Sequence, residues 1–154
     1  MGPSSSRIPA LLDALNVQIG GPLSDDGWQV FDGPPGQQVL EPDVFVLGHA
    51  GLDSGASIQT QVERAQGLGH RHFEVFEISC VLSSVTGEDD GFALLRQRLL
   101  AGLSIIEGVL TSGSLVGSVV DAAQLGPSME WAQASTEDGR AMDLLFSIVG
   151  KALL

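Results

Sequence analysis

Apolar residues near the N-terminus recur at intervals of three and four, which is typical of a short helix with one buried side: Leu11, Leu12, Leu15 and Ile19. Pro9 suits the first turn of this helix, because the N–H group that proline lacks is not needed there. The run Gly20-Gly21-Pro22 should end the helix. The pattern therefore predicts one short N-terminal helix.

A longer stripe with the same spacing lies in the middle of the chain and predicts a second helix from about Asp90 to Leu110: Phe92, Leu95, Leu99, Leu103, Ile106 and Leu110. The single-sided stripe indicates a helix that lies lengthwise over a sheet. Gly102 and Gly108 weaken this helix but allow close packing of another group against its backbone.

Several segments have the pattern of strands. The unbroken apolar run 44–47 predicts a strand covered on both faces, whereas the alternation that begins at Ser57 predicts a strand with one wet face. Shorter strands are expected at 28–31 and within 119–125. Residues 48–56, between the run 44–47 and the alternation that begins at Ser57, are expected to form a flexible loop.

The longest expected strand runs from Arg71 to Val85 and changes phase along its length. Phe73 and Val75 lie in one phase, and the apolar residues that follow lie in the other: Phe76, Ile78, Cys80 and Leu82. Such a slip predicts a β-bulge near Val75 and Phe76, or a strand end covered on both faces.

The C-terminal third predicts a hairpin. Residues 129–133 and 142–148 alternate, and Asp138-Gly139 between them favours a tight turn with a positive φ. The order of elements is typical of an α+β fold: a mainly antiparallel or mixed β-sheet with one short N-terminal helix and one long central helix packed on it. We expect a single domain over 1–154, with 1–7 as a flexible tail.

Charge limits the classes of partner. The 154 residues contain 19 acidic and 7 basic side chains, a net charge of −12, with no basic cluster. Such a chain should repel nucleic acid backbones and anionic membranes. The chain contains no apolar stretch long enough to span a bilayer and no signal peptide pattern, so we expect synthesis in the cytoplasm.

The candidates for chemistry are few. His70-Arg71-His72, with His49 as a third nitrogen, is the nearest approach to a metal site, but solvated or interface histidines are the better interpretation. Cys80, the single cysteine, lies among apolar residues and is expected to be a buried strand thiol. Because the chain lacks a nucleophile elbow and a phosphate loop, we expect no catalytic residue, cofactor or metal.

Two further groups of residues favour structural roles over chemistry. Asp89 and Asp90 are explained by the start of the central helix, where carboxylates stabilise the helix dipole. Trp28 and Trp131 are expected to be core or interface anchors, since nothing basic beside them indicates base stacking. These observations favour an assembly or binding module over an enzyme.

The order of these segments resembles that of tail terminator (tail completion) proteins of long-tailed phages. The segments are Ile8-Pro9, the strand at 43–48, the run 76–90 before the central helix, Met129-Glu130-Trp131 and the hairpin. The resemblance implies a virion structural protein that forms a hexameric ring on the head-proximal end of the tail tube. The ring would stop tube polymerisation and join the head connector.

The implied partners are further copies of the chain, the tail tube protein and the head–tail connector. DNA would pass through the lumen without specific binding, and no membrane is involved. The resemblance implies no active-site residues. The predicted subunit contact is the turn before the central helix: Ser83, Ser84, Thr86, Glu88, Asp89 and Asp90.

Other interpretations remain open at this point. A head–tail connector or a tail tube subunit would share the size, acidity and fold class. A small metal-dependent hydrolase would use His49, His70 and His72 around a metal. A ligand-binding module would contain a sizeable apolar pocket.

Overall fold

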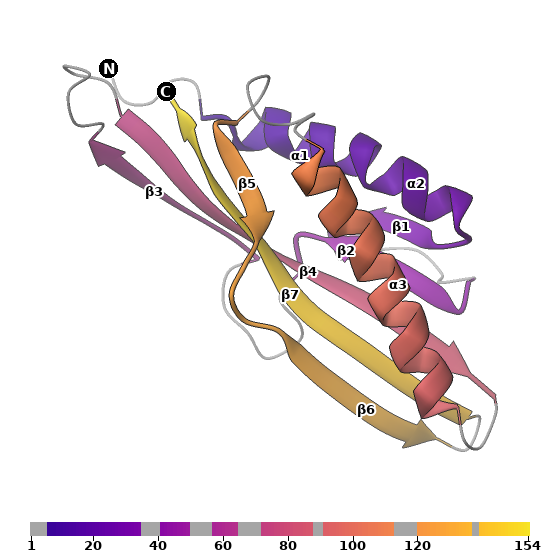
Figure 1. Cartoon of the computed structure of the whole chain (residues 1–154). Helices are drawn as coiled ribbons and strands as arrows, with labels where there is room; N and C mark the ends of the chain where they lie inside the picture. Colours follow the sequence, from indigo (N-terminus) through magenta and orange to yellow (C-terminus); the bar gives the residue numbers. More distant parts are fainter. Residues whose placement is uncertain are drawn as a thin grey trace.

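A computed structural model of the chain describes residues 6–34, 41–49, 57–64, 72–87, 91–112, 120–136 and 139–154. Helices cover one face of a seven-stranded sheet (Figure 1). In chain order the elements are α1 (Ile8–Gln18), α2 (Gly20–Asp25), β1 (Gln29–Asp32), β2 (Asp43–Leu47), β3 (Ile58–Arg64), β4 (His72–Thr86), α3 (Phe92–Thr111), β5 (Ala122–Leu125), β6 (Glu130–Thr136) and β7 (Gly139–Leu153). The α+β class expected from the sequence is confirmed.

The centre of the sheet is the antiparallel pair β4 and β7, each 15 residues long. Their pairing runs without a break from Phe73 opposite Leu153 to Thr86 opposite Arg140. Strands β3 and β2 follow one another along the outer side of β4, and β5 and β6 do the same along β7. Strand β1 pairs in parallel with β2, so the sheet is mixed, and β1 and β6 lie at opposite edges.

The predicted β-bulge is wrong, because β4 advances one residue at a time against both β3 and β7. The phase slip agrees instead with the alternative prediction of a strand end covered on both faces, because this end of β4 carries apolar residues on both faces. Phe76 is buried on the helix side, whereas Phe73 and Val75 are half-buried on the other face. The Nζ atom of Lys151 lies 4.7 Å from the centre of the Phe73 ring and partly covers it.

The main core fills the space between the helices and the sheet. The rings of Phe45 on β2 and Phe146 on β7 stack there, with centroids 6.4 Å apart. The helices bury the predicted stripes against them, and the helix residues with no exposed surface are Leu11, Leu15, Ile19, Leu23, Leu95, Leu99 and Ile106. Each such side chain contributes about 1.5–3 kcal/mol by its removal from water, so these stripes determine where the helices lie.

The N-terminal helical segment is longer than the sequence pattern predicts. Helix α1 ends at Gln18, but Ile19 keeps helical angles (φ −87°, ψ −43°) and the chain continues directly into α2. Pro22 lies in the first turn of α2, where its absent N–H group breaks no hydrogen bond. The expected stop at Gly20-Gly21-Pro22 is therefore wrong, and Leu23 adds one more buried residue to the same face.

Helix α3 begins at Phe92, two residues after the predicted start, with Gly91 as its N-cap. A Cβ atom on Gly102 would lie 2.7 Å from Cζ2 of Trp28, so the indole packs directly on the helix backbone. The expected close packing is confirmed at Gly102. It is wrong for Gly108, which has nothing within 4 Å of that position.

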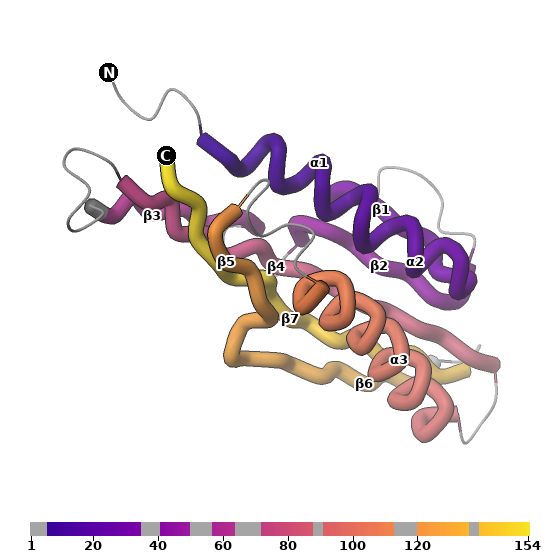
Figure 2. The backbone as a smooth tube through the Cα atoms, turned by 45° about the horizontal axis from the view of Figure 1, so that its top comes forward, coloured from indigo at the N-terminus to yellow at the C-terminus, as the bar shows by residue number. Residues whose placement is uncertain are grey.

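The C-terminal hairpin is confirmed. Strand β6 pairs with β7 from Glu130 opposite Leu145 to Thr136 opposite Gly139. Gly139 has a φ of +141°, and a Cβ atom there would collide with the carbonyl oxygen of Thr86 at the end of β4. Glycine is thus required both by the turn and by the neighbouring strand. The tube view shows that β6 and the α1–α2 segment lie on opposite sides of α3 (Figure 2).

Candidate functional site

The predicted subunit contact lies only partly within the described residues. Ser83 is half-buried on the open face of the sheet, where its hydroxyl donates to Oδ1 of Asp143 at 2.6 Å. Ser84 is fully buried on the helix side and has no exposed surface to offer a neighbouring subunit. Thr86 is half-buried at the strand end. Glu88, Asp89 and Asp90 lie outside the described residues.

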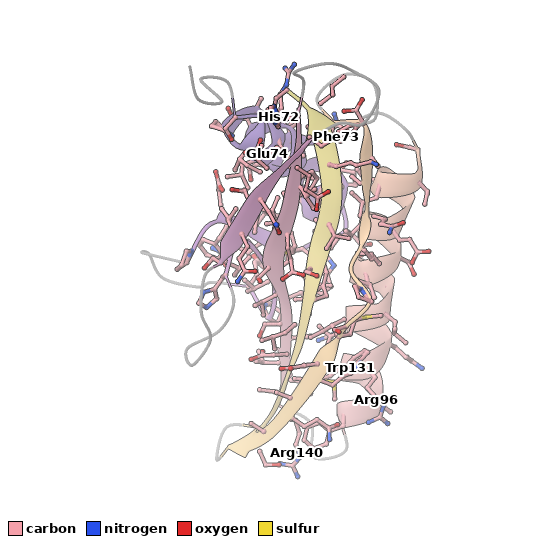
Figure 3. All side chains as sticks on the ribbon, turned by 90° about the vertical axis from the view of Figure 1, so that its left-hand side faces the viewer. His72, Phe73, Glu74, Arg96, Trp131 and Arg140 are labelled. Atoms are coloured by element: carbon pink, nitrogen blue, oxygen red, sulfur yellow. The ribbon has the colours of Figure 1, made fainter. Side chains whose placement is uncertain are left out.

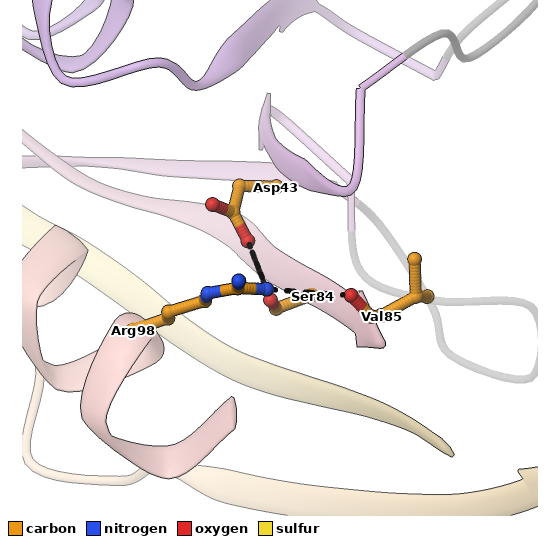
Figure 4. Close-up of polar contacts among 4 residues, drawn as sticks. All are labelled: Asp43, Ser84, Val85 and Arg98. Atoms are coloured by element: carbon orange, nitrogen blue, oxygen red, sulfur yellow. Dashed lines mark hydrogen bonds and ion pairs between the residues drawn. The ribbon is translucent and has the colours of Figure 1, made fainter. Parts of the chain in front are cut away.

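Ser84 belongs instead to a polar cluster that joins α3 to the end of the sheet (Figure 4). Its hydroxyl donates to Oδ1 of Asp43 at 2.5 Å, which satisfies the buried polar group. Nη1 of Arg98 lies 3.8 Å from the same carboxylate oxygen and 3.4 Å from the carbonyl oxygen of Val85. The cluster connects β2, β4 and α3, and its contacts are structural.

A second polar cluster lies at the opposite end of β4, where Figure 3 labels Glu74 beside Phe73. Glu74 is only 4 % exposed. Its carboxylate accepts a hydrogen bond from the hydroxyl of Ser6 and another from the backbone N–H of Arg7, both at 2.7 Å. Ser6 and Arg7 were expected in a flexible tail, but Glu74 fixes them at the N-terminus of α1. Residues 1–5 lie outside the described residues.

The two described histidines do not approach one another. The backbone N–H of His49 donates to the carbonyl oxygen of Ser79 on β4. His72 lies seven residues from Ser79 on that strand, or about 23 Å at 3.3 Å per residue. One metal ion cannot bind both imidazoles, because zinc–nitrogen bonds are only about 2.1 Å long. Among the described residues no group of three metal-binding side chains occurs, and His70 lies outside them.

Cys80 is confirmed as a buried strand thiol. It is fully buried in the main core, and burial raises the pKa of its thiol from 9.0 to about 12. The thiolate is the reactive form of cysteine, so this side chain is chemically inert at neutral pH.

The open face of the sheet contains a shallow hollow of about 280 Å³ between β3, β4 and β7. Its lining is mostly amides and aliphatic carbons, with one carboxylate: Gln59, Thr60, Gln61, Val75, Phe76, Glu77 and Val149. A single carboxylate supplies no pair of groups for acid–base catalysis.

Three large apolar residues on α3 and on or just before β6 are exposed. Leu100 on α3, Met129 just before β6 and Trp131 on β6 are 50 %, 47 % and 44 % exposed. Nη1 of Arg96 approaches Oε1 of Gln133 at 3.5 Å and brings a positive charge to the same place. Figure 3 shows Trp131 and Arg96 together, with Arg140 further along. We call Arg96, Leu100, Met129 and Trp131 the α3–β6 patch.

The opposite side of the helix layer is acidic. Residues 8–63 contain no lysine or arginine. Six carboxylates on the described part of this segment are exposed: Asp13, Asp25, Asp26, Asp32, Glu41 and Glu63. Val17, one helical turn after Asp13, is 71 % exposed. We call Asp13, Val17, Asp25 and Asp26 the α1–α2 surface.

Sequence patterns single out both tryptophans but neither Leu100 nor Arg96 of the α3–β6 patch. Trp28 is a core anchor as expected, at 4 % exposed, and the exposed Trp131 remains a candidate interface anchor. Leu100 carried a usable signal, because it is a large apolar residue outside the buried stripe of α3. The sequence contains no signal for the role of Arg96, because that role depends on a strand that begins 34 residues later.

No helix among the described residues is long and apolar enough to cross a membrane. Comparison of the chain with protein-family models and with curated protein sequences finds no match.

Proposed function

We propose that the chain is a virion structural protein, a phage tail terminator whose copies form a hexameric ring on the head-proximal end of the tail tube. It is made in the host cytoplasm and functions without a cofactor, between the tube and the head connector. The order of its segments resembles that family, and its α+β fold is the class expected from the sequence.

The observation that carries the proposal is the difference between the two sides of the subunit. Strand β1 and the acidic α1–α2 surface lie on one side, and β6 with the α3–β6 patch lies on the other. A subunit with two unlike sides associates head to tail, and such contacts close into a ring when the rotation between copies allows it. The excess of acidic residues supports a ring through which DNA passes without binding.

The test is a tube-capping assay with the tail tube protein of the same virion. The purified chain is added to elongating tubes, and tube lengths are measured by negative-stain electron microscopy. A terminator shortens the length distribution, binds at one tube end and does not polymerise alone. Native mass spectrometry of the chain should show a closed, metal-free hexamer.

Other results would overturn the proposal in identifiable ways. Tubes formed by the chain alone would indicate a tube subunit. A ring that binds the portal end of heads but leaves tube length unchanged would indicate a head–tail connector. A monomer with one stoichiometric metal ion would favour the hydrolase interpretation, although the separation of His49 and His72 counts against it.

A further inference from the structure

We infer that the α3–β6 patch of one copy binds the α1–α2 surface of the next copy. This inference rests on the proposed function, because it names the contact between neighbouring subunits of the proposed ring. It depends on the shape and charge of two surfaces that the chain leaves exposed.

The patch takes residues from two elements that approach each other. Arg96 and Gln133 mark where α3 and β6 approach each other. Leu100 lies four residues after Arg96, which is about 6 Å along α3. Trp131 lies two residues before Gln133, which is about 6.6 Å along β6. Because α3 and β6 run in opposite directions, both steps lead the same way from the contact (Figure 1). Leu100 therefore comes level with Trp131. The patch is an apolar area with a guanidinium at its end.

Trp131 stays exposed because of its position on the helix side of β6. Trp131 pairs across the strands with Leu144, which is fully buried beneath α3. Trp131 thus points to the same side as the core but lies one strand further out, beyond the width that α3 covers. A rigid indole at the rim of a core is the type of residue that dominates binding energy in protein interfaces.

The α1–α2 surface has the complementary composition. Val17 projects from α1, one turn from the carboxylate of Asp13, and Asp25 and Asp26 follow at the end of α2. An apolar residue between carboxylates matches an apolar area beside an arginine. Three carboxylates belong to the α1–α2 surface, and residues 8–63 contain no lysine or arginine, so an arginine from another copy would be attracted to this surface.

The two surfaces lie on different sides of the subunit, so one copy can use both at once (Figure 2). The contact is then heterologous: each copy offers its patch to one neighbour and its acidic surface to the other. A patch that paired with itself would bring two Arg96 side chains together, which costs binding energy.

Two double variants test the contact, and their oligomeric state is measured by native mass spectrometry and sedimentation velocity. The first, Arg96→Glu with Trp131→Ser, disables the patch. The second, Asp13→Arg with Val17→Ser, disables the acidic surface. Since all four side chains lie at the surface, the variants should fold, which circular dichroism checks. Lys151→Glu and Glu77→Arg are controls that make the same charge changes elsewhere.

Wild type and both controls should form the closed oligomer. Each double variant alone should associate at least about tenfold more weakly. An equimolar mixture of the two should form heterodimers that grow no further, because only one intact patch and one intact acidic surface remain between them. A monomeric wild type, normal assembly of the acidic-surface variant, or a mixture that stays monomeric would each overturn the inference.

The same proteins separate this inference from the proposed function. If wild type assembles through this contact but leaves tube growth unchanged, the contact is supported and the terminator role is wrong. If both double variants cap tubes as well as wild type, the terminator role is supported and the contact is wrong.

Discussion

The two ends of β4 hold their helices by different kinds of polar contact. At one end, the Glu74 carboxylate is 4 % exposed and receives hydrogen bonds from a hydroxyl and a backbone N–H. At the other end, the side chains of Arg98 and Asp43 are 34 % and 19 % exposed and lie 3.8 Å apart. Buried donors and acceptors are costly to leave unpaired, whereas exposed ion pairs contribute little. The Glu74 end should therefore matter more for stability.

The largest effect is expected for Glu74→Ala. The substitution leaves the Ser6 hydroxyl and the Arg7 N–H without their acceptor at the start of α1, and we expect a loss of about 2–3 kcal/mol in the free energy of unfolding. Urea denaturation measures it. Glu74→Gln keeps one acceptor oxygen and should lose about half as much. An equal loss in both variants would show that the charge, and not the hydrogen bonds, holds the helix.

Ser84→Ala should be intermediate. It removes the buried hydroxyl that donates to Asp43, so we expect the free energy of unfolding to fall by about 1–2 kcal/mol. Ser83→Ala is the matched control, because Ser83 makes an equivalent bond to Asp143 on the more exposed face of the strand. If Ser83→Ala costs as much as Ser84→Ala, burial does not decide the strength of these contacts.

Arg98→Met should cost no more than about 1 kcal/mol, because the ion pair with Asp43 is partly exposed. The difference between variant and wild type should shrink as sodium chloride is added to the urea titration. Arg96→Met removes the same charge from the same helix without an ion pair, and its effect should be close to zero. A larger loss in Arg98→Met that salt leaves unchanged would mean that the hydrogen bond to Val85 dominates.

The smallest effect concerns Cys80, which lies between the two clusters on β4. Because burial raises its pKa in the folded protein from 9.0 to about 12, the folded state keeps its proton when the unfolded state has lost it. This contribution to stability is complete below pH 9 and is lost progressively as the pH rises toward 12. At pH 9 the loss should be well under about 1 kcal/mol. The chain has no tyrosine and one lysine, so few other side chains titrate there.

Thermal unfolding at pH 7, 9 and 10 measures this dependence. Cys80→Ala is less stable at every pH because it leaves a small cavity, but its stability should change less between pH 7 and 10 than that of wild type. Equal slopes in the two proteins would contradict the assignment.

Local patterns were sufficient to predict much of the fold. The stripes of α1 and α3 and the alternation of β3 are properties of a few neighbouring residues, and the structure contains the elements they predict. Gly139 has the positive φ expected of the hairpin turn, whereas Asp138 lies outside the described residues. The errors arose where local rules compete. Gly20-Gly21-Pro22 has the composition of a stop, but burial of Ile19 and Leu23 against the sheet keeps the chain helical.

The candidate sites were harder to predict because they depend on distant pairs. Ser84 was placed in a surface contact from its neighbourhood in a polar turn, yet its partner Asp43 lies 41 residues earlier and draws it inward. Likewise, no local pattern marks Glu74 among the acidic residues. Its hydrogen-bond donors, Ser6 and Arg7, lie 68 and 67 residues earlier in the chain. One sequence carries no signal for such pairs.

The order in which the sheet forms follows from its centre. Residues paired between β4 and β7 are 54 positions apart at one end, Thr86 with Arg140, and 80 at the other, Phe73 with Leu153. Closing such large loops is slow, whereas the β6–β7 hairpin needs only a two-residue turn. In a newly made chain the β6–β7 hairpin should therefore form first, and the edge of β7 that later pairs with β4 should stay unpaired for a time. That interval is when the protein is most exposed to aggregation, so its yield should depend on temperature and expression rate more than its final stability suggests.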